Sequence, residues 1–339
     1  MMMKSPFVFF AAVLVALAGP LLAPAPAATT LSLGTLAPEG TSYHKSLLEM
    51  REKWRKAPAG GVNLRIFAGG KMGGESKMVS QMRLGALDAA LLTATGLSEI
   101  EQAVTGLQSV PMMLRSLDEA DYIGAKLQPT LEKRMEKAGF VVLFWTDAGW
   151  IRFFSKKPMT TPEDLQKSKL FIWAGDSYYA EMWKDGGFQP VPLETADVIP
   201  MLDTGLINCV PVPPFAALAL QLHDRAPHML EINWAPLVGA MVVRKSAWEK
   251  IPAETRVELL KAARETGVQN KAQGRAESNR AVEAMKSKGL TAHPVSTELE
   301  VRWRRAAEPF YPKLKGKLIP ADIWDEVDRL LKEYRAGKP

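Results

Sequence analysis

The stretch VNLRIFAGGKMGGESKMVSQMRLGALDAALLT, residues 62–93, decides the fold class. Its first six residues, Val62–Phe67, alternate apolar and polar side chains, which predicts a strand with one buried face. After a glycine-rich loop, Glu75–Leu84 is predicted to be a helix and Ala89–Thr93 a second short strand. This order is typical of a mainly parallel sheet with helices on both faces. The sequence therefore predicts an α/β fold.

The alternation of strands and helices continues on both sides of this stretch. Thr41 or Ser42 is placed to cap one helix, and Thr161 with Pro162 is placed to begin another. The run Pro211-Val212-Pro213-Pro214 is expected to interrupt regular structure, because proline lacks an N–H group. Further strands are predicted at residues 31–36, 141–145, 151–155, 169–173 and 207–210.

Residues 252–288 form a long stretch in which nearly every residue permits a helix. A helix of about 35 residues is roughly 50 Å long at 1.5 Å per residue, which exceeds one small lobe. We therefore expect one helix that runs along two lobes. The alternative is a pair of helices that break near Gly267 or Gly274.

The composition limits the class of protein. A length of 339 residues favours two lobes over one compact domain. The hydrophobic fraction of 47% and the charged fraction of 24% exclude disorder and a multispan membrane protein as overall descriptions. Cys209 is the only cysteine, which excludes internal disulfides and cysteine-based zinc sites. The formal charge of +6 is spread along the chain and gives no indication of nucleic-acid binding.

Residues 1–27 are predicted to be a signal peptide. Lys4 supplies a positive charge, an apolar run follows, and Ala25-Pro26-Ala27 offers small residues for cleavage after Ala27. The alternative is an uncleaved anchor, but the apolar run of roughly 16 residues is shorter than the ~20 that span a bilayer. We expect a soluble mature protein in the periplasm.

Short motifs that follow one another along the chain identify a family resemblance. They are residues 34–38 with 43–45, 69–75, 82–88, 110–112, and 155–158 with 162–165. In this order they resemble the solute-binding receptors of tripartite ATP-independent periplasmic (TRAP) transporters, of the dicarboxylate-receptor (DctP-like) type. The resemblance implies a two-lobed periplasmic clamp, in which each lobe is a mostly parallel sheet flanked by helices, with a long helix spanning both. It also implies integral membrane TRAP subunits as partners.

The two-lobed clamp that the resemblance implies leads to expected residue bounds for each lobe. Lobe I is expected to contain residues 28–149 and about 238–270. Lobe II is expected to contain residues 150–237 and about 271–339. The ligand is expected between the lobes.

The chain departs from the family at the residues that the resemblance assigns to the ligand. A family strand carries an arginine that binds a ligand carboxylate, and the matching position in Lys169–Trp173 is Phe171. A second family arginine, in a "GxR" turn, is matched one residue late by Arg152, which either reaches the ligand or forms an ion pair elsewhere. Val212 stands where the family has an asparagine. These changes predict a cleft that disfavours a C4-dicarboxylate, because a buried carboxylate without a partner is costly.

Aromatic side chains gather near the same stretches and are typical of an apolar small-molecule site. For any one of them a place in the core is the alternative, and for His44 the alternative is the surface of the first helix. The predicted ligand-binding residues are Phe171, Trp173, Arg152, Val212, Trp150, Tyr43, His44, Tyr178 and Trp234.

The predicted function is that of an extracytoplasmic receptor for a hydrophobic, aromatic or weakly polar small molecule, acting as a monomer. One alternative is a monocarboxylate receptor that uses Arg152, and another is a periplasmic carrier or sensor without a transport partner. No enzyme is expected, because the sequence has no GxSxG elbow, HExxH helix or nucleotide-binding loop. No cofactor, metal or nucleic acid is expected to bind.

Overall fold

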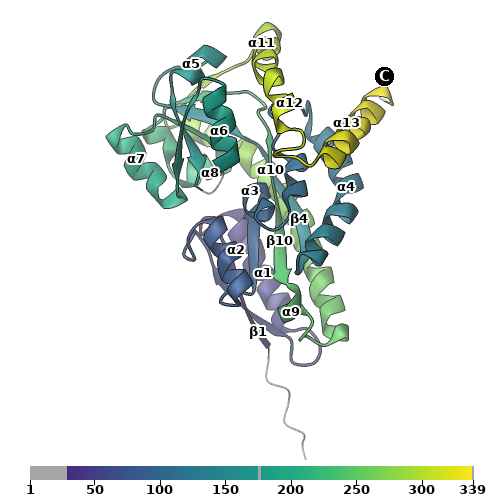
Figure 1. Ribbon diagram of the computed structural model, residues 1–339. Helices are drawn as coiled ribbons and strands as arrows, with labels where there is room; N and C mark the ends of the chain where they lie inside the picture. The colour runs from purple at the N-terminus through teal and green to yellow at the C-terminus, as the bar shows by residue number, and fades with distance from the viewer. Residues whose placement is uncertain (1–28, 175–176, 338–339) are drawn as a thin grey trace, which may run out of the picture.

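The computed structural model describes residues 29–174 and 177–337. The predicted signal peptide lies outside these residues. Two sheets organise the chain, each with helices packed around it (Figure 1). The helices α5 to α8 gather around the second sheet, and α1 to α3 lie with the first (Figure 1).

The first sheet has five strands in the order β2-β1-β3-β10-β4. They are β2 (Val62–Phe67), β1 (Thr29–Thr35), β3 (Ala89–Thr93), β10 (Pro236–Arg244) and β4 (Phe140–Trp150). β1 runs parallel to β2 and β3, whereas β10 runs antiparallel to β3 and β4. The strand–helix–strand unit predicted over residues 62–93 is therefore present at the predicted bounds.

The helices of the first sheet begin where the sequence supplies caps. The Thr41 side chain accepts a hydrogen bond from the N–H of His44 at the start of α1 (Ser42–Arg55). The buried face of α1 carries Leu47, Met50 and Trp54, at spacings of three and four residues. The other helices of this part are α2 (Glu75–Leu84), α3 (Ala94–Ser98), η1 (Gln102–Leu107), α4 (Leu117–Lys137) and α9 (Lys245–Trp248).

The second sheet has six strands in the order β11-β9-β5-β8-β6-β7. They are β11 (Thr291–His293), β9 (His228–Leu230), β5 (Arg152–Ser155), β8 (Cys209–Val212), β6 (Lys169–Trp173) and β7 (Gln189–Leu193). Both sheets are mixed, and the chain crosses between them three times, the last time from β10 to β11. It crosses from β4 to β5 and returns from β9 to β10, and these strands form antiparallel pairs within each sheet.

The helices of the second sheet include one that the sequence predicted in detail. Thr161 and Asp164 form a reciprocal capping box at the start of α5 (Pro162–Gln166). The others are α6 (Ser177–Asp185), η2 (Thr195–Asp197), α7 (Val198–Thr204), α8 (Pro214–Ala219), η3 (Leu222–Asp224), α11 (Thr297–Ala307), η4 (Glu308–Phe310) and α12 (Tyr311–Leu314). The C-terminal helix α13 (Ala321–Ala336) follows them in the chain.

The prediction that the run Pro211-Val212-Pro213-Pro214 interrupts regular structure is correct only at Pro213, which lies between β8 and α8. β8 continues through Pro211, which pairs with Phe153 of β5. The pairing between β8 and β6 joins Leu170 to Cys209, so Pro211 lies beyond it and its missing N–H costs no bond there. Pro214 occupies the first turn of α8, a position that suits proline.

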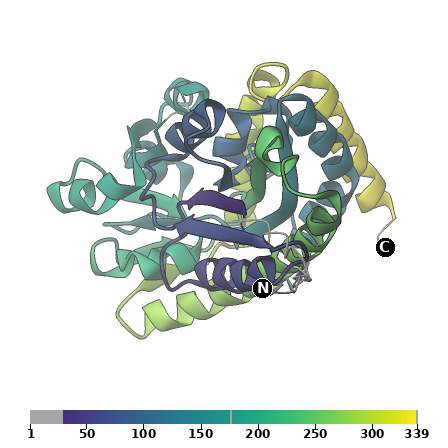
Figure 2. The ribbon, with the colours of Figure 1, turned by 90° about the horizontal axis from the view of Figure 1, so that it is seen from below.

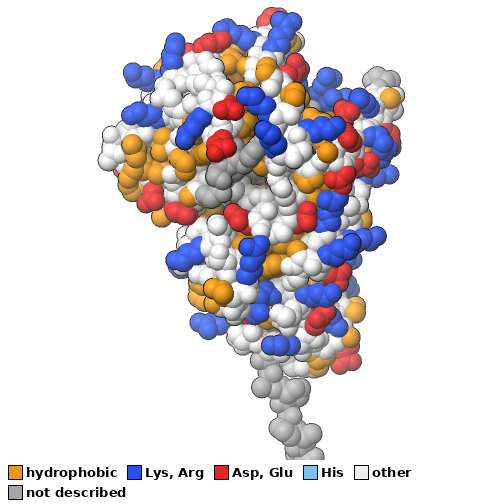
Figure 3. All heavy atoms as spheres, in the orientation of Figure 1, with side chains coloured by type: hydrophobic (Ala, Val, Ile, Leu, Met, Phe, Trp, Pro, Cys, Tyr) orange, Lys and Arg blue, Asp and Glu red, His pale blue; other side chains and the backbone are white. Residues whose placement is uncertain are grey.

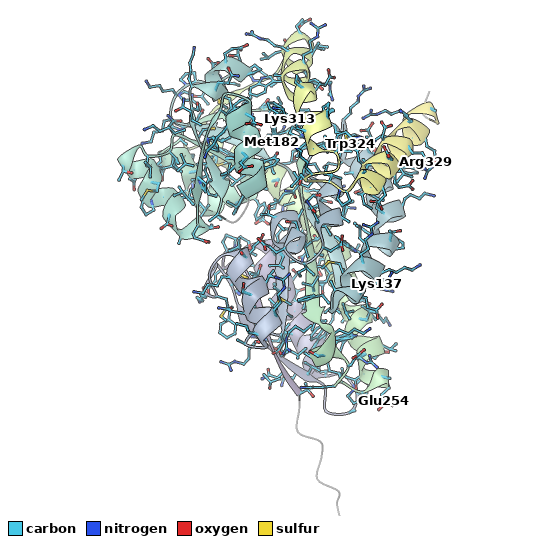
Figure 4. The ribbon with its side chains drawn as sticks, in the orientation of Figure 1. Lys137, Met182, Glu254, Lys313, Trp324 and Arg329 are labelled. Carbon is cyan, nitrogen blue, oxygen red and sulfur yellow. The ribbon has the colours of Figure 1, made fainter. Side chains whose placement is uncertain are left out.

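The long helix α10 (Ala253–Lys286) is continuous over 34 residues. It packs against α1 and β4 of the first sheet and against α8 of the second, and Figure 2 shows it running beside α1 across the molecule. In Figure 4, Glu254 marks its start at the lower end of the molecule. The alternative of two helices is therefore wrong.

The glycines of α10 allow close approach of its neighbours. A β-carbon at Gly267 would lie 2.6 Å from the β-carbon of Phe144, and one at Gly274 would overlap the hydroxyl group of Tyr43. Glycine inside a helix costs about 1 kcal/mol relative to alanine. Here that cost accompanies tight packing of the helix on β4 and α1.

The predicted residue bounds of the two lobes stay a prediction. The C-terminal helix α13 packs against α4, which lies on the first sheet, so this contact favours placing α13 with the first lobe. Figure 4 labels Arg329 on α13.

Within residues 29–174 and 177–337, none of the helices is both long and apolar enough to span a bilayer. On the face in Figure 3, basic and acidic side chains are interspersed.

Two histidines meet where β9 pairs with β11. His228 Nδ1 lies 3.1 Å from His293 Nε2. Burial and the neighbouring His293 hold the pKa of His228 below its ordinary value. The unfolded chain therefore binds more protons than the folded chain when the pH falls below about 6.5, the ordinary histidine pKa. This contribution to stability is present above that pH and is lost below it.

We expect the free energy of unfolding to fall between about pH 7.5 and about pH 5.5, and to fall less in His228→Gln. Urea titrations at the two pH values measure the difference. Thr291→Ser is the control, because Thr291 pairs with His228 across the strands and does not titrate. An equal pH dependence in His228→Gln and the unaltered protein would contradict the prediction.

Candidate functional site

A cavity of about 140 Å³ lies between the two sheets. From the first sheet and its helices it receives Tyr43 of α1 and Asp147 of β4, and from the second sheet it receives Trp173 of β6 and Val212 of β8. The other lining residues are Thr35, Leu36, Ala37, Pro38, Glu75, Leu91, Leu92, Thr93, Thr146, Ala148, Thr195, Pro213, Phe215, Ala216, Leu220, Leu237, Val238 and Gly239. We call this space the main cavity.

Aromatic rings from both halves of the molecule meet at the main cavity. Tyr43 stacks on Phe215 of α8, with ring centroids 5.3 Å apart and an interplanar angle of 26°. The Tyr43 hydroxyl donates to the carbonyl oxygen of Asp147 at 2.6 Å. Burial and then the Asp147 carboxylate raise the pKa of Tyr43, which remains a neutral donor. These contacts hold one wall of the cavity in place.

Glu75 places a carboxyl group at the main cavity. As the first residue of α2 it is 7% exposed, and its oxygens accept from Thr93 N at 2.7 Å, Thr93 Oγ1 at 2.6 Å and Gly96 N at 2.9 Å. Burial raises the pKa of Glu75, although these three hydrogen bonds oppose the rise. Within the described residues, none of these hydrogen-bond partners of Glu75 is a basic side chain.

Asp147 is the second acidic residue of the lining, and it is already paired. Its carboxylate accepts from Arg275 Nε at 2.8 Å and from Arg275 Nη2 at 2.7 Å. Arg275 also binds Asp121 of α4, so α10, α4 and β4 are joined behind the cavity. Lining residues within the described ranges include no lysine, arginine or histidine. Charge at the main cavity is therefore acidic or neutral.

The predicted site residues do not all come together in the structure. Tyr43, Trp173 and Val212 line the main cavity. Phe171 and Trp234 line a second, smaller space that Trp173 shares. Tyr178 lies on α6, and its side chain is outside the described part of the chain.

The remaining three predicted residues lie away from both spaces as the structure describes them. Arg152 is half-buried and donates to the Asn233 side chain, and burial lowers its pKa to about 10. His44 accepts a hydrogen bond from Gly40 N at 3.2 Å on the outer side of α1. Trp150 is half-buried at the end of β4, opposite Pro236.

The second space, which we call the aromatic chamber, adjoins the main cavity at Trp173. Phe171 is 1% exposed, and its ring meets Trp173 edge to face with centroids 5.0 Å apart. Trp183 of α6 stacks on Trp234 at 5.4 Å. The lining residues are Thr95, Gln108, Ser109, Ile151, Phe171, Ile172, Trp173, Tyr179, Trp183, Pro211, Trp234 and Ala235.

Sequence reasoning missed several residues that the structure brings to these spaces. Glu75 is the last residue of the 69–75 motif, so that motif could have identified it as a candidate site residue. Phe215, Thr195 and Trp183 follow no motif, and they reach the spaces only because of how α8, η2 and α6 pack.

The two halves touch beside the main cavity. The Glu194 side chain, which follows β7, lies against Gly74, the N-cap of α2. A β-carbon at position 74 would overlap the Glu194 carboxyl group. Gly74 supplies no side-chain cap, and a negative charge near a helix N-terminus is favourable. The contact brings an acidic group of one half to a helix of the other.

Residues 33–317 match the family described as "DctP: Bacterial extracellular solute-binding protein, family 7". The chain belongs to the DctP family. This membership confirms the resemblance to DctP-like receptors that the motifs indicated.

Relatives of this DctP-family chain share its length and its fold. The C4-dicarboxylate-binding periplasmic protein DctP of Rhodobacter capsulatus is 22% identical over 285 residues, which are 84% of this chain and 85% of that protein. DctP7 of Bordetella pertussis, an extracytoplasmic solute receptor binding pyroglutamic acid, has a TM-score of 0.82 at 17% identity; the match covers 90% of this chain and 100% of that chain. A TRAP periplasmic solute binding protein from Shewanella oneidensis, with bound succinate, has a TM-score of 0.83 at 16% identity, with coverage of 90% and 100%. The two-lobed α/β fold is thereby confirmed.

Proposed function

We propose that this DctP-family receptor captures an uncharged, mainly apolar small molecule between its two lobes and delivers it to membrane TRAP subunits. The observation that carries the proposal is the lining of the main cavity, where the described residues supply apolar and aromatic side chains and two acidic groups but no basic one. Closing two lobes around a ligand excludes water, which favours an apolar solute.

The charge at the cavity argues against the anions that the relatives' structures hold. A carboxylate in the main cavity would lie near Glu75 and Asp147, and the Arg275 guanidinium is already paired with Asp147 and Asp121. Burial of an anion without a partner costs several kcal/mol, even after relaxation. The monocarboxylate alternative needs Arg152 at the ligand, whereas its side chain bonds to Asn233.

The proposal also includes the location of the protein and its membrane partners. The receptor is exported by a cleaved signal peptide, works in the periplasm as a monomer, and changes no bond in its ligand. Membrane subunits receive the solute when the lobes open. A carrier without such subunits would have the same cavity. Uptake measurements in cells with and without genes for TRAP membrane subunits separate the two roles.

Calorimetric titration of the purified protein tests the ligand class. We expect no binding of succinate, pyroglutamate or galacturonate at millimolar concentration. Native mass spectrometry of protein purified without unfolding is expected to show a retained neutral ligand. Micromolar affinity for any of the three anions would refute the proposal of an uncharged ligand.

A further inference from the structure

Two histidine rings face each other at the edge of the second sheet. β11 is the edge strand, and it runs parallel to β9. His228 Nδ1 lies 3.1 Å from His293 Nε2, whereas the ring centroids are 5.2 Å apart. The rings therefore meet by their nitrogen-bearing edges and do not stack face to face. No sequence motif marks this pair, because its members are 65 residues apart in the chain.

The strand pairing holds both rings on one face of the sheet. His228 is aligned with Thr291, and Leu230 is aligned with His293. Side chains two residues apart on a strand point to the same face, so His228 and His293 share a face. Both histidines are partly exposed, whereas His223 is only 5% exposed. Solvent therefore reaches both residues of the pair.

The spacing of the two nitrogens suits a metal ion. Zinc binds histidine nitrogen at about 2.0–2.1 Å, so two such ligands on one ion lie about 2.8 Å apart at a right angle and about 3.4 Å apart at the tetrahedral angle. The observed 3.1 Å falls between these limits. Each neutral ring has a second nitrogen that is able to carry the proton, so both facing nitrogens are able to act as acceptors at once. A small rotation of the rings would then point both lone pairs at one ion.

The surroundings of the pair leave the other ligand positions to water. Glu231 is the next acidic residue along the chain, and its carboxylate lies 3.8 Å from Lys286 Nζ of α10. It is three residues from His228, so alternation turns it to the opposite face of the sheet. Among the described residues, no three histidine, cysteine or acidic side chains are grouped to hold a metal. A site with two protein ligands is therefore expected to bind more weakly than a structural zinc site with four.

We propose that His228 and His293 form a site for one divalent transition-metal ion, such as Zn²⁺ or Cu²⁺, and that this ion fastens β11 to β9. Imidazole is a suitable ligand for both metals. β11 is the first strand after α10, which packs on both halves of the molecule, so the ion would also secure the end of that helix. A metal that joins distant segments stabilises a protein by closing a long loop. This site departs from the expectation, drawn from the sequence, that no metal binds.

Nuclear magnetic resonance of the histidine rings tests the site in the full mature protein. The protein is prepared without a histidine tag and is treated with EDTA, which is then removed. The chain has four histidines, so single substitutions assign each ring signal. Zn²⁺ is expected to shift the His228 and His293 signals together, to saturate at one ion per chain, and to leave the His44 signal in place. Mg²⁺ is expected to shift none of them, because it prefers oxygen ligands.

Variants test whether both rings hold the ion. His228→Gln and His293→Gln are each expected to weaken Zn²⁺ binding at least about tenfold in calorimetric titration, because the loss of an outer partner of a metal ligand already costs about 10–100-fold. His44→Gln is the matched control, since it removes a histidine outside the pair, and it is expected to keep the affinity. Zn²⁺ is also expected to raise the midpoint of thermal unfolding in the unaltered protein and in His44→Gln, but not in the two variants of the pair.

Three results would overturn the proposal. The first is that millimolar Zn²⁺ leaves the His228 and His293 signals in place, and the second is that the two signals move at different Zn²⁺ concentrations, as they would if each ring bound a separate ion. The third is an equal Zn²⁺ affinity in His228→Gln and the unaltered protein. Because the signals are read first in the unaltered protein, a folding defect in a variant leaves the test intact. None of these results bears on the ligand of the main cavity, which the titrations with anions test separately.

Discussion

Phe171→Arg is expected to lower the free energy of unfolding by about 3–5 kcal/mol, the usual cost of a buried charge without a partner. Phe171 is 1% exposed, and it packs with Phe154, Val210 and Met285 in one apolar cluster. The aromatic chamber beside it offers no acidic side chain among its described lining residues. The guanidinium would therefore have neither water nor a carboxylate around it.

Urea unfolding followed by circular dichroism measures this loss. Phe171→Leu is the control, since it removes part of the ring but adds no charge, and it is expected to cost less. Stability equal to that of the unaltered protein, together with new micromolar binding of succinate, would show that position 171 faces a ligand as the arginine of the family resemblance does.

Gly274→Ala is expected to lower the free energy of unfolding by about 1–3 kcal/mol, although alanine is the better helix former. The added methyl group would overlap the Tyr43 hydroxyl. This hydroxyl donates to the carbonyl oxygen of Asp147, and the Tyr43 ring stacks on Phe215. Either α10 moves away from α1 or Tyr43 leaves its place in the wall of the main cavity. Ligand affinity is expected to fall together with stability.

The neighbouring exposed residue provides the comparison for this change. Gln273→Ala adds no atom at the interface and is expected to change the free energy of unfolding by less than about 0.5 kcal/mol. Thermal unfolding of both variants measures the difference. A Gly274→Ala variant that is more stable than the unaltered protein would mean that α10 does not lie this close to Tyr43.

Local sequence signals predicted most elements of the fold. The cap at Thr41, the capping box at Thr161 and the alternation in Val62–Phe67 act over a few residues, so they are readable without the tertiary structure. The continuity of α10 also follows from its composition. The effect of Pro211 was predicted incorrectly. A strand accepts proline where no neighbouring strand needs a hydrogen bond from that N–H group, and the pairing of the strands is not visible in the sequence.

The site was less predictable, because its residues come from elements far apart in the chain. The motif that pointed to Tyr43 and the position of Trp173 at the end of a strand led to lining residues. The hydrogen bond of Arg152 could be predicted only by knowing where Asn233 lies. The place of Phe215 in the lining could be predicted only by knowing how α8 packs near α1. Alternation along β6 places Phe171 and Trp173 on the same face, but only the packed structure puts Trp173 at the main cavity and Phe171 in the chamber wall.

Cys209 lies on β8 with no exposed surface, and burial raises the pKa of its thiol. Because it is the only cysteine in the chain, the native protein has no thiol that reacts readily with a label. Cysteines introduced in pairs, one on the outer face of α1 and one on α7, would carry spin labels or fluorophores without background. Distances between such labels, measured with and without a ligand, would show directly in solution whether the two halves move.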